Sequence, residues 1–169
     1  MMQMMNGEQL VDRAIGIRVS PRGVYYAVIQ GTESYEILTV ASVVVPPALG
    51  LPEQLHFMRT TVLDIMAEYK VTRAGIRLTE PTAKCTSVER LNLEGVIQEL
   101  LSSSSVETYF AGPIATIAAR LGETERSRVK EYFEGQSFLG VDGWGAYSRE
   151  ARESIVTAVA AARLPQRHV

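Results

Sequence analysis

Two glutamates three residues apart, Glu150 and Glu153, are the acids whose spacing most readily suggests a shared site. This spacing places both carboxylates on one face of a helix. Acids in the first turn of a helix also interact favourably with its positive end, so a purely structural role is the simpler interpretation of the pair.

Two arginines stand inside apolar, strand-like stretches. Arg18 lies between Ile17 and Val19, and Arg77 follows Ile76. Such an arginine either faces solvent from an edge strand or pairs with a buried acid or a ligand. A guanidinium stays protonated and offers no lone pair to a metal ion. We expect Arg18 and Arg77 to be paired or to face a ligand if their strands are central.

The glycine-rich loop at 138–147 carries three aromatic residues, Phe138, Trp144 and Tyr147. Aromatic rings on such a loop can stack on bases or anchor a protein partner, or they can cap the core, which we favour. Arg22, in a turn between two expected strands, could contact a phosphate. Trp144, Tyr147 and Arg22 are therefore the candidate binding residues.

The sequence lacks the residues or motifs that several other classes of catalytic and nucleotide-binding site require. His56 and His168 have no convincing partner, and Cys85 is best interpreted as a small apolar residue in a turn. The chain contains no G-x-S-x-G elbow, no phosphate-binding P-loop and no G-x-G-x-x-G motif. These absences argue against catalytic triads, thiol proteases and nucleotide-loop enzymes.

Composition limits the class of protein further. The chain has 169 residues, 46% of them apolar, with a net charge of −2 and one cysteine. This length suits a single domain, which we place at 13–169 after a flexible tail at 1–12. A single cysteine excludes intrachain disulfides and suits a reducing, cytoplasmic compartment. No apolar run is long enough to cross a bilayer, so we expect no membrane partner.

Hydrophobic periodicity and turn residues predict a mixed α/β sheet. A helix at 52–70 separates three antiparallel strands from a further strand, which indicates a crossover into a parallel pairing. The expected elements are strands at 13–20, 24–30 and 36–45, a helix at 52–70, a strand at 74–78, a helix at 91–101, a strand at 106–111, helices at 114–121 and 123–134, and a final helix that begins after Ser148 and ends before Pro165.

This order of elements, together with several local motifs, resembles the RNase H-like superfamily and its branch of RuvC-type Holliday junction resolvases. The stretch G-I-R-V-S-P-R-G-V-Y-Y-A-V-I resembles the first hairpin of that branch, and L-E-G-V-I-Q-E-L-L resembles its central helix. The stretch I-R-L-T-E-P-T-A-K is similar to a small, uncharacterised group of bacterial RNase H-like proteins. The resemblance implies a mixed five-stranded sheet, with three antiparallel strands followed by parallel ones, flanked by helices.

The same resemblance implies a two-metal site that this sequence has largely lost. Nucleases of the family place acids on the first strand, at the end of the fourth strand and in the last helix. Here the two strand positions are Arg18 and Arg77, although Glu80 follows three residues later, and only the helical pair Glu150 and Glu153 keeps its charge. We therefore expect an ion-pair cluster in place of the metals, and no cofactor.

Three functions remain open. We favour a noncatalytic module, or pseudo-nuclease, that acts through protein association as a homo-oligomer or as a subunit of a nucleic-acid-processing complex. The first alternative is a Mg²⁺- or Mn²⁺-dependent nuclease with Glu80, Glu150 and Glu153 as its acids. The second is a protein that binds nucleic acid through arginines but does not cleave it.

Overall fold

A computed structural model of the chain describes residues 11–165, so most of the expected tail at 1–12, as well as His168, lies outside the described residues. No helix within the described range combines the length and apolar character needed to cross a membrane. The elements in chain order are β1 (Arg13–Ser20), β2 (Gly23–Gln30), β3 (Glu36–Val44), α1 (Leu51–Glu68), β4 (Arg73–Arg77), α2 (Val88–Ser103), β5 (Thr108–Gly112), α3 (Ile114–Leu121), α4 (Arg126–Phe133), a 3-10 turn (Trp144–Ala146) and α5 (Arg149–Ala162).

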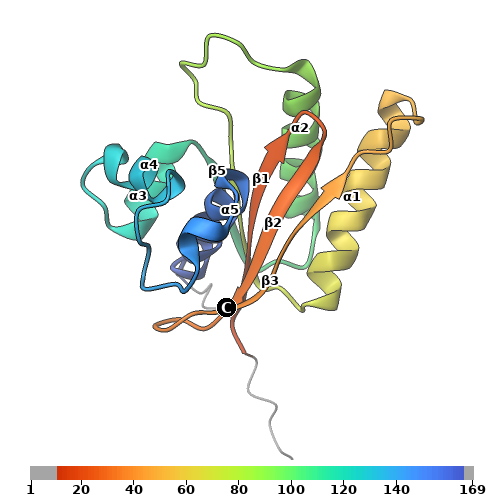
Figure 1. The fold of residues 1–169 in the computed structure, drawn as a ribbon. Coiled ribbons are helices and arrows are strands. Elements are labelled where there is room, and N and C mark those ends of the chain that lie inside the picture. Colours follow the sequence, from red (N-terminus) through yellow and green to blue (C-terminus); the bar gives the residue numbers. More distant parts are fainter. Residues whose placement is uncertain (1–10, 166–169) are drawn as a thin grey trace, which may run out of the picture.

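The five strands form one mixed sheet in the order β3-β2-β1-β4-β5 (Figure 1). Strands β1, β2 and β3 are antiparallel neighbours. Strand β4 pairs in parallel with β1, and β5 pairs in parallel with β4. The structure thus confirms the expected fold class, a mixed five-stranded sheet flanked by helices, and places β1 at the centre.

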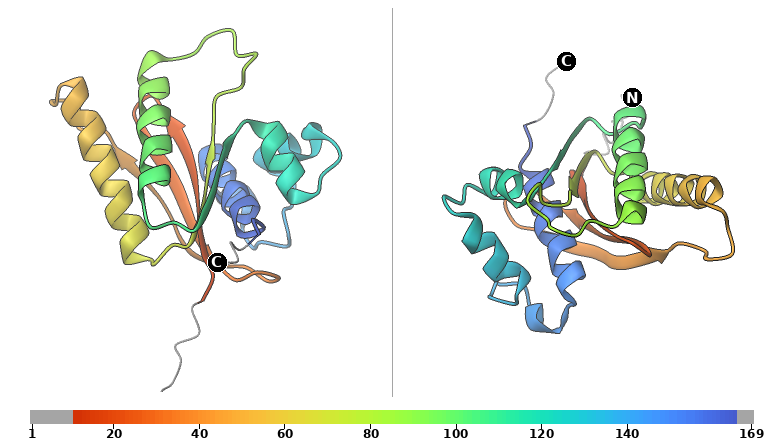
Figure 2. Two further views of the ribbon diagram at one scale, coloured as in Figure 1. Left: turned by 180° about the vertical axis from the view of Figure 1, so that it is seen from behind. Right: turned by 90° about the horizontal axis from the view of Figure 1, so that it is seen from above.

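Helices cover both faces of the sheet (Figure 2). Helices α1 and α2 pack on one face, and α5 packs on the other with α3 and α4 beside it. Strand β1 serves both layers because its side chains alternate between the faces. Ile15 and Ile17 belong to the α1/α2 core, and Ala14 belongs to the α5 core. The alternation therefore directs Arg18, four residues after Ala14, toward α5.

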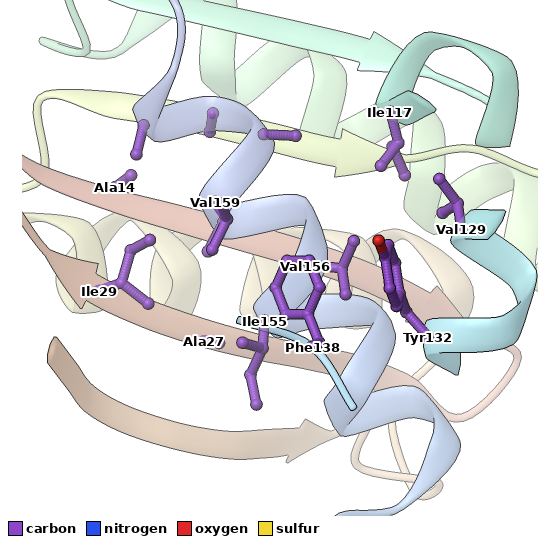
Figure 3. Close-up of a cluster of buried hydrophobic side chains, with 14 of the residues drawn as sticks. Ala14, Ala27, Ile29, Ile117, Val129, Tyr132, Phe138, Ile155, Val156 and Val159 are labelled. Carbon is purple, nitrogen blue, oxygen red and sulfur yellow. The ribbon is translucent and has the colours of Figure 1, made fainter. Parts of the chain in front are cut away.

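The core beneath α5 joins the sheet to the small helices (Figure 3). Ile155, Val156 and Val159 of α5 are buried together with Ile29 of β2 and Phe138 of the loop after α4. This packing anchors α5 along its length and fixes the direction in which its first turn presents side chains.

Two glycines of the central strands make room for close neighbours, Gly16 for α5 and Gly75 for the Phe110 ring. Gly16 of β1 and Gly75 of β4 are partners in the parallel ladder. A Cβ on Gly16 would overlap the backbone of Ser154 and Ala158 in α5, and one on Gly75 would overlap the Phe110 ring. The helix therefore lies directly against the β1 backbone.

Arginines occupy both ends of β4, two residues on either side of Gly75. Arg73 is buried and its Nη1 donates a hydrogen bond to the backbone oxygen of Ala162, at the C-terminal end of α5. A cation at this end of a helix stabilises the unpaired carbonyls. Arg77, at the other end of the strand, lies near the start of α5.

Some element boundaries differ from those expected. Strand β4 runs from Arg73 to Arg77 and β5 from Thr108 to Gly112, one to two residues away from the predicted ranges. The charged helix expected at 123–134 begins only at Arg126, because Gly122 ends α3 in the left-handed conformation (φ 73°) and Glu125 is extended. The observed β4 register makes Arg77 the direct partner of Arg18.

We predict that Gly16→Ala destabilises the protein by about 1–3 kcal/mol or more, because the added methyl forces α5 away from β1. Urea unfolding monitored by circular dichroism measures this change. The matched control is Gly95→Ala in α2, where a Cβ meets nothing within 4 Å. This control should gain about 0.5–1 kcal/mol from helix propensity, and equal losses in both variants would contradict the close-approach argument.

Candidate functional site

The candidate site lies where the C-terminal ends of β1 and β4 meet the first turn of α5. Arg18 and Arg77 are direct neighbours in the parallel ladder, and both lie on the α5 side of the sheet. Helix α5 begins after Ser148, whose side-chain oxygen accepts a hydrogen bond from the Ala151 amide. This cap fixes the first turn of the helix, and Glu153 then faces the two arginines.

The Glu153 carboxylate is buried and shared by three guanidiniums. Only 1% of its side chain is exposed. Its Oε2 lies 3.0 Å from Nε of Arg18 and 3.4 Å from Nε of Arg77. Its Oε1 accepts a hydrogen bond of 3.2 Å from Nε of Arg149. We call Arg18, Arg77, Arg149 and Glu153 the Glu153 cluster.

Arg77 has the least favourable environment in this cluster. Burial lowers the pKa of its guanidinium from the usual value, the Glu153 carboxylate partly offsets this, and the charges of Arg90 and Arg18 lower the pKa further. Its guanidinium carbon also lies 5.9 Å from the centre of the Phe133 ring, within cation–π range. Arg77 is therefore a buried cation whose charge is only partly compensated.

Glu80 has a structural contact that the sequence did not reveal. Its Oε1 accepts a hydrogen bond of 2.9 Å from the backbone amide of Ile114, the first residue of α3. The same oxygen lies 3.8 Å from Nη2 of Arg77, which is a long ion pair. Pro113 precedes α3 and provides no side-chain cap. The Glu80 carboxylate therefore accepts a hydrogen bond from a backbone amide in the first turn of α3 that has no partner within the helix.

Glu150 does not join the cluster expected for the helical pair. It is half-buried, and no ion pair links it to Arg18 or Arg77 within the described residues. It lies nearly one helical turn closer to the start of α5 than Glu153. Arg149 takes part instead, four residues before Glu153, and its Nη1 also pairs with Glu134 at 2.9 Å. The four-residue spacing was the sequence signal for this contact.

These residues do not suit a divalent metal ion. Mg²⁺ and Mn²⁺ require several free oxygen ligands, whereas guanidiniums engage both oxygens of Glu153. Across residues 11–165 no group of three or more histidine, cysteine, aspartate or glutamate side chains could hold a metal. The alternative acid set, Glu80, Glu150 and Glu153, is thus not assembled as a metal site.

The other predicted binding residues lie elsewhere. Trp144 is only 4% exposed, and its Nε1 donates to the backbone oxygen of Tyr132, so its side chain belongs to the core. Tyr147 is half-buried against Trp144, with ring centres 6.2 Å apart. Arg22 is exposed in the β1–β2 turn. The loop aromatics therefore cap the core, as we favoured.

A second buried acid, Glu94 of α2, lies on the other side of Arg77. It is 4% exposed, and its Oε1 accepts hydrogen bonds from the Thr79 amide, the Thr79 hydroxyl and Nε of Arg90. Glu94 and Arg90 were not among the predicted site residues, although their four-residue spacing within a helix is a known pairing signal. Glu94 fixes Arg90 beside the end of β4.

Comparisons with known proteins identify the fold. No model of a known protein family and no curated protein matches the sequence. Among solved structures, RuvC of Thermus thermophilus superposes with a TM-score of 0.65 at 16% identity, covering 89% of this chain and 93% of that one. The T. thermophilus RuvC in complex with a Holliday junction substrate gives 0.63 at 14% identity, with the same coverage. The chain has the RuvC fold.

The RuvC-like fold bears out the expected RNase H-like architecture. At 14–16% identity the likeness concerns the arrangement of helices and strands, not the chemistry of the site. What this site can do therefore follows from its own side chains, and these form a cationic cluster around one buried carboxylate.

We predict that Glu153→Gln destabilises the fold by about 3–5 kcal/mol, because it leaves three arginines without their shared anion. Denaturant unfolding gives the value. Adding Arg18→Met to Glu153→Gln should recover part of the loss, since one uncompensated charge is removed. The matched control, Glu150→Gln, should stay within about 0.5 kcal/mol of the wild type. Equal effects at Glu150 and Glu153 would contradict the cluster.

Proposed function

We propose that this protein is a noncatalytic RuvC-like module that acts by associating with other protein chains, as a homo-oligomer or as a subunit of a nucleic-acid-processing complex. One observation carries the first part of the proposal. The buried acid at the start of α5, Glu153, gives both its oxygens to arginines.

Three guanidiniums around one carboxylate oppose metal-dependent cleavage on electrostatic grounds. Divalent cations assist phosphoryl chemistry by approaching oxygen ligands closely and stabilising negative charge. The guanidiniums of Arg18 and Arg77 lie 3.0 and 3.4 Å from the same Glu153 oxygen, and a guanidinium is a cation that offers no lone pair to a metal ion. A cation entering this site would displace them and face their charges.

Surface composition supports the association part of the proposal. The net charge is −2, which has the same sign as nucleic acid and provides no general attraction to it. Large apolar side chains are exposed at one end of the molecule, where α1 and α2 both begin (Figure 1): Leu49, Leu51, Val88 and Leu91. An apolar patch to which such side chains contributed would suit a protein contact. Cys85, the single cysteine, is exposed, which suits the proposed cytoplasmic location.

The catalytic question is tested by incubating the protein with Mg²⁺ or Mn²⁺ and four-way junctions, duplexes or single strands, with an active metal-dependent nuclease as positive control. We expect no cleavage, and no saturable Mg²⁺ binding in calorimetry. Cleavage that Glu150→Gln or Glu80→Gln abolishes would overturn the proposal in favour of the altered acid set.

Self-association is tested by sedimentation velocity over a range of protein concentrations. If the exposed patch at the start of α2 mediates it, Leu91→Glu should shift the protein to monomer, because a charge would be buried in an apolar contact. Leu139→Glu is the matched control, since Leu139 is 56% exposed in a different region, after α4. A wild type that stays monomeric at every concentration would contradict the homo-oligomer.

A further inference from the structure

A pocket of about 310 Å³ lies next to the Glu153 cluster. It is formed by the ends of β1 and β4, the loop that follows β4 and the first turn of α2, and that loop forms an arch above the sheet in Figure 1. We call it the arginine pocket. Its polar lining includes Arg18, Arg77, Arg90, Thr79, Glu80 and Ser87.

The lining of the arginine pocket carries excess positive charge. Three guanidiniums line it against a single carboxylate, that of Glu80. The two buried acids that pair with these arginines, Glu153 and Glu94, are not part of the lining. A ligand in the pocket therefore meets the three arginines and Glu80, but neither Glu153 nor Glu94.

Arg90 has an unused hydrogen-bond donor, its buried Nη2, which finds no partner within the described part of the chain. Nε of Arg77 likewise makes no hydrogen bond, but it lies 3.4 Å from the carboxylate of Glu153, which is not part of the lining. The Arg77 side chain is only 8% exposed, and its ion pairs to Glu153 and Glu80 are long, at 3.4 and 3.8 Å. Buried donors without partners are costly. An anion in the pocket would compensate this charge and reduce the mutual repulsion of the arginines, which contributes to the lowered pKa of Arg77.

Helix α2 adds a further positive feature. Its N-cap, Ser87, lines the pocket, and the helix continues for 16 residues to Ser103. The amides of a first helical turn carry partial positive charge and favour anions. The start of α2 and the arginine side chains therefore both contribute positive potential to the arginine pocket.

We propose that the arginine pocket binds a phosphate monoester or inorganic phosphate as a dianion. Planar guanidinium forks match the oxygens of a phosphate, and three such groups line the pocket together with one carboxylate. No aromatic ring lines the pocket, so it offers no surface for stacking on a base. The recognised element is therefore the phosphate group, carried by a small molecule or by the end of a nucleic-acid strand.

This inference rests on the proposed function, because a divalent metal held by Glu153 would change the charge of the site. The inference goes beyond the proposed function because it assigns an anionic ligand to the pocket. The metal ions of a nuclease are cations and thus have the opposite charge. The pocket would then sense or hold a phosphorylated group at the place where the resemblance implies cleavage.

Calorimetry with inorganic phosphate tests the proposal on the full chain. We expect one saturable site, with dimethyl phosphate, a singly charged diester, binding more weakly. Arg90→Gln should weaken phosphate binding about tenfold or more, since a charge-assisted contact is lost. Arg128→Gln is the matched control, because Arg128 also pairs within its helix, with Glu131, but lies outside the pocket. No saturable binding at millimolar phosphate, or binding unaffected by Arg90→Gln, would overturn the assignment.

Cys85 provides a test that needs no substitution. It lines the pocket, is exposed and is the sole cysteine in the sequence. Modification with a methanethiosulfonate that carries a sulfonate should weaken phosphate binding, whereas the neutral methyl reagent should have a smaller effect. Equal effects of both reagents would contradict an electrostatic site at this position.

Further titrations separate the sources of the phosphate and the two proposals. Oligonucleotides with a 5′-phosphate are compared with the same strands ending in a hydroxyl. A preference for the phosphorylated end assigns the site to strand ends, and equal affinities together with inorganic phosphate binding assign it to small molecules. Absence of both phosphate and Mg²⁺ binding would refute the arginine pocket alone, whereas metal-dependent cleavage would refute the proposed function.

Discussion

One buried carboxylate determines the electrostatics of this molecule. Glu153 lies between the central strands and α5, and it is the anion shared by Arg18, Arg77 and Arg149. Burying charged groups is costly unless they are paired and hydrogen-bonded. The position of α5 against the sheet is therefore coupled to the charge state of this cluster, and so is the character of the adjacent arginine pocket.

The RuvC-like fold of this chain carries a cluster of arginines around one carboxylate at the start of α5. A scaffold fixes where the ends of β1 and β4 and the start of α5 meet, and the side chains placed there decide the chemistry. The resemblance implies acids and metal ions at this junction. Here Arg18 and Arg77 occupy it, with Glu153 as their counter-ion.

The fold was largely predictable from the sequence, and the site only in part. Strand-like runs around a Pro/Gly turn and a helix before the fourth strand indicated the mixed sheet, because hydrophobic periodicity is a local property. To predict that Arg18 and Arg77 are neighbours, one needs the order of the strands and the register of β1 with β4. The resemblance helped to define the strand order. The cap that Glu80 gives to α3 and the burial of Glu94 depend on contacts between elements distant in the chain, and local pattern does not encode them.

The arrangement of β4 beneath α5 has a consequence for the order of folding. Arg73 and Arg77 stand at the two ends of the strand, and α5 provides a backbone carbonyl to the first and a carboxylate to the second. A ribosome synthesises residues 149–162 after the entire sheet, so both cations lack these partners until that stretch emerges. Without α5, the ion pairs left to these arginines are the long ones to Asp12 and Glu80, at 3.6 and 3.8 Å, and the apolar side chains beneath α5 are uncovered. Docking of α5 removes both problems in one cooperative step.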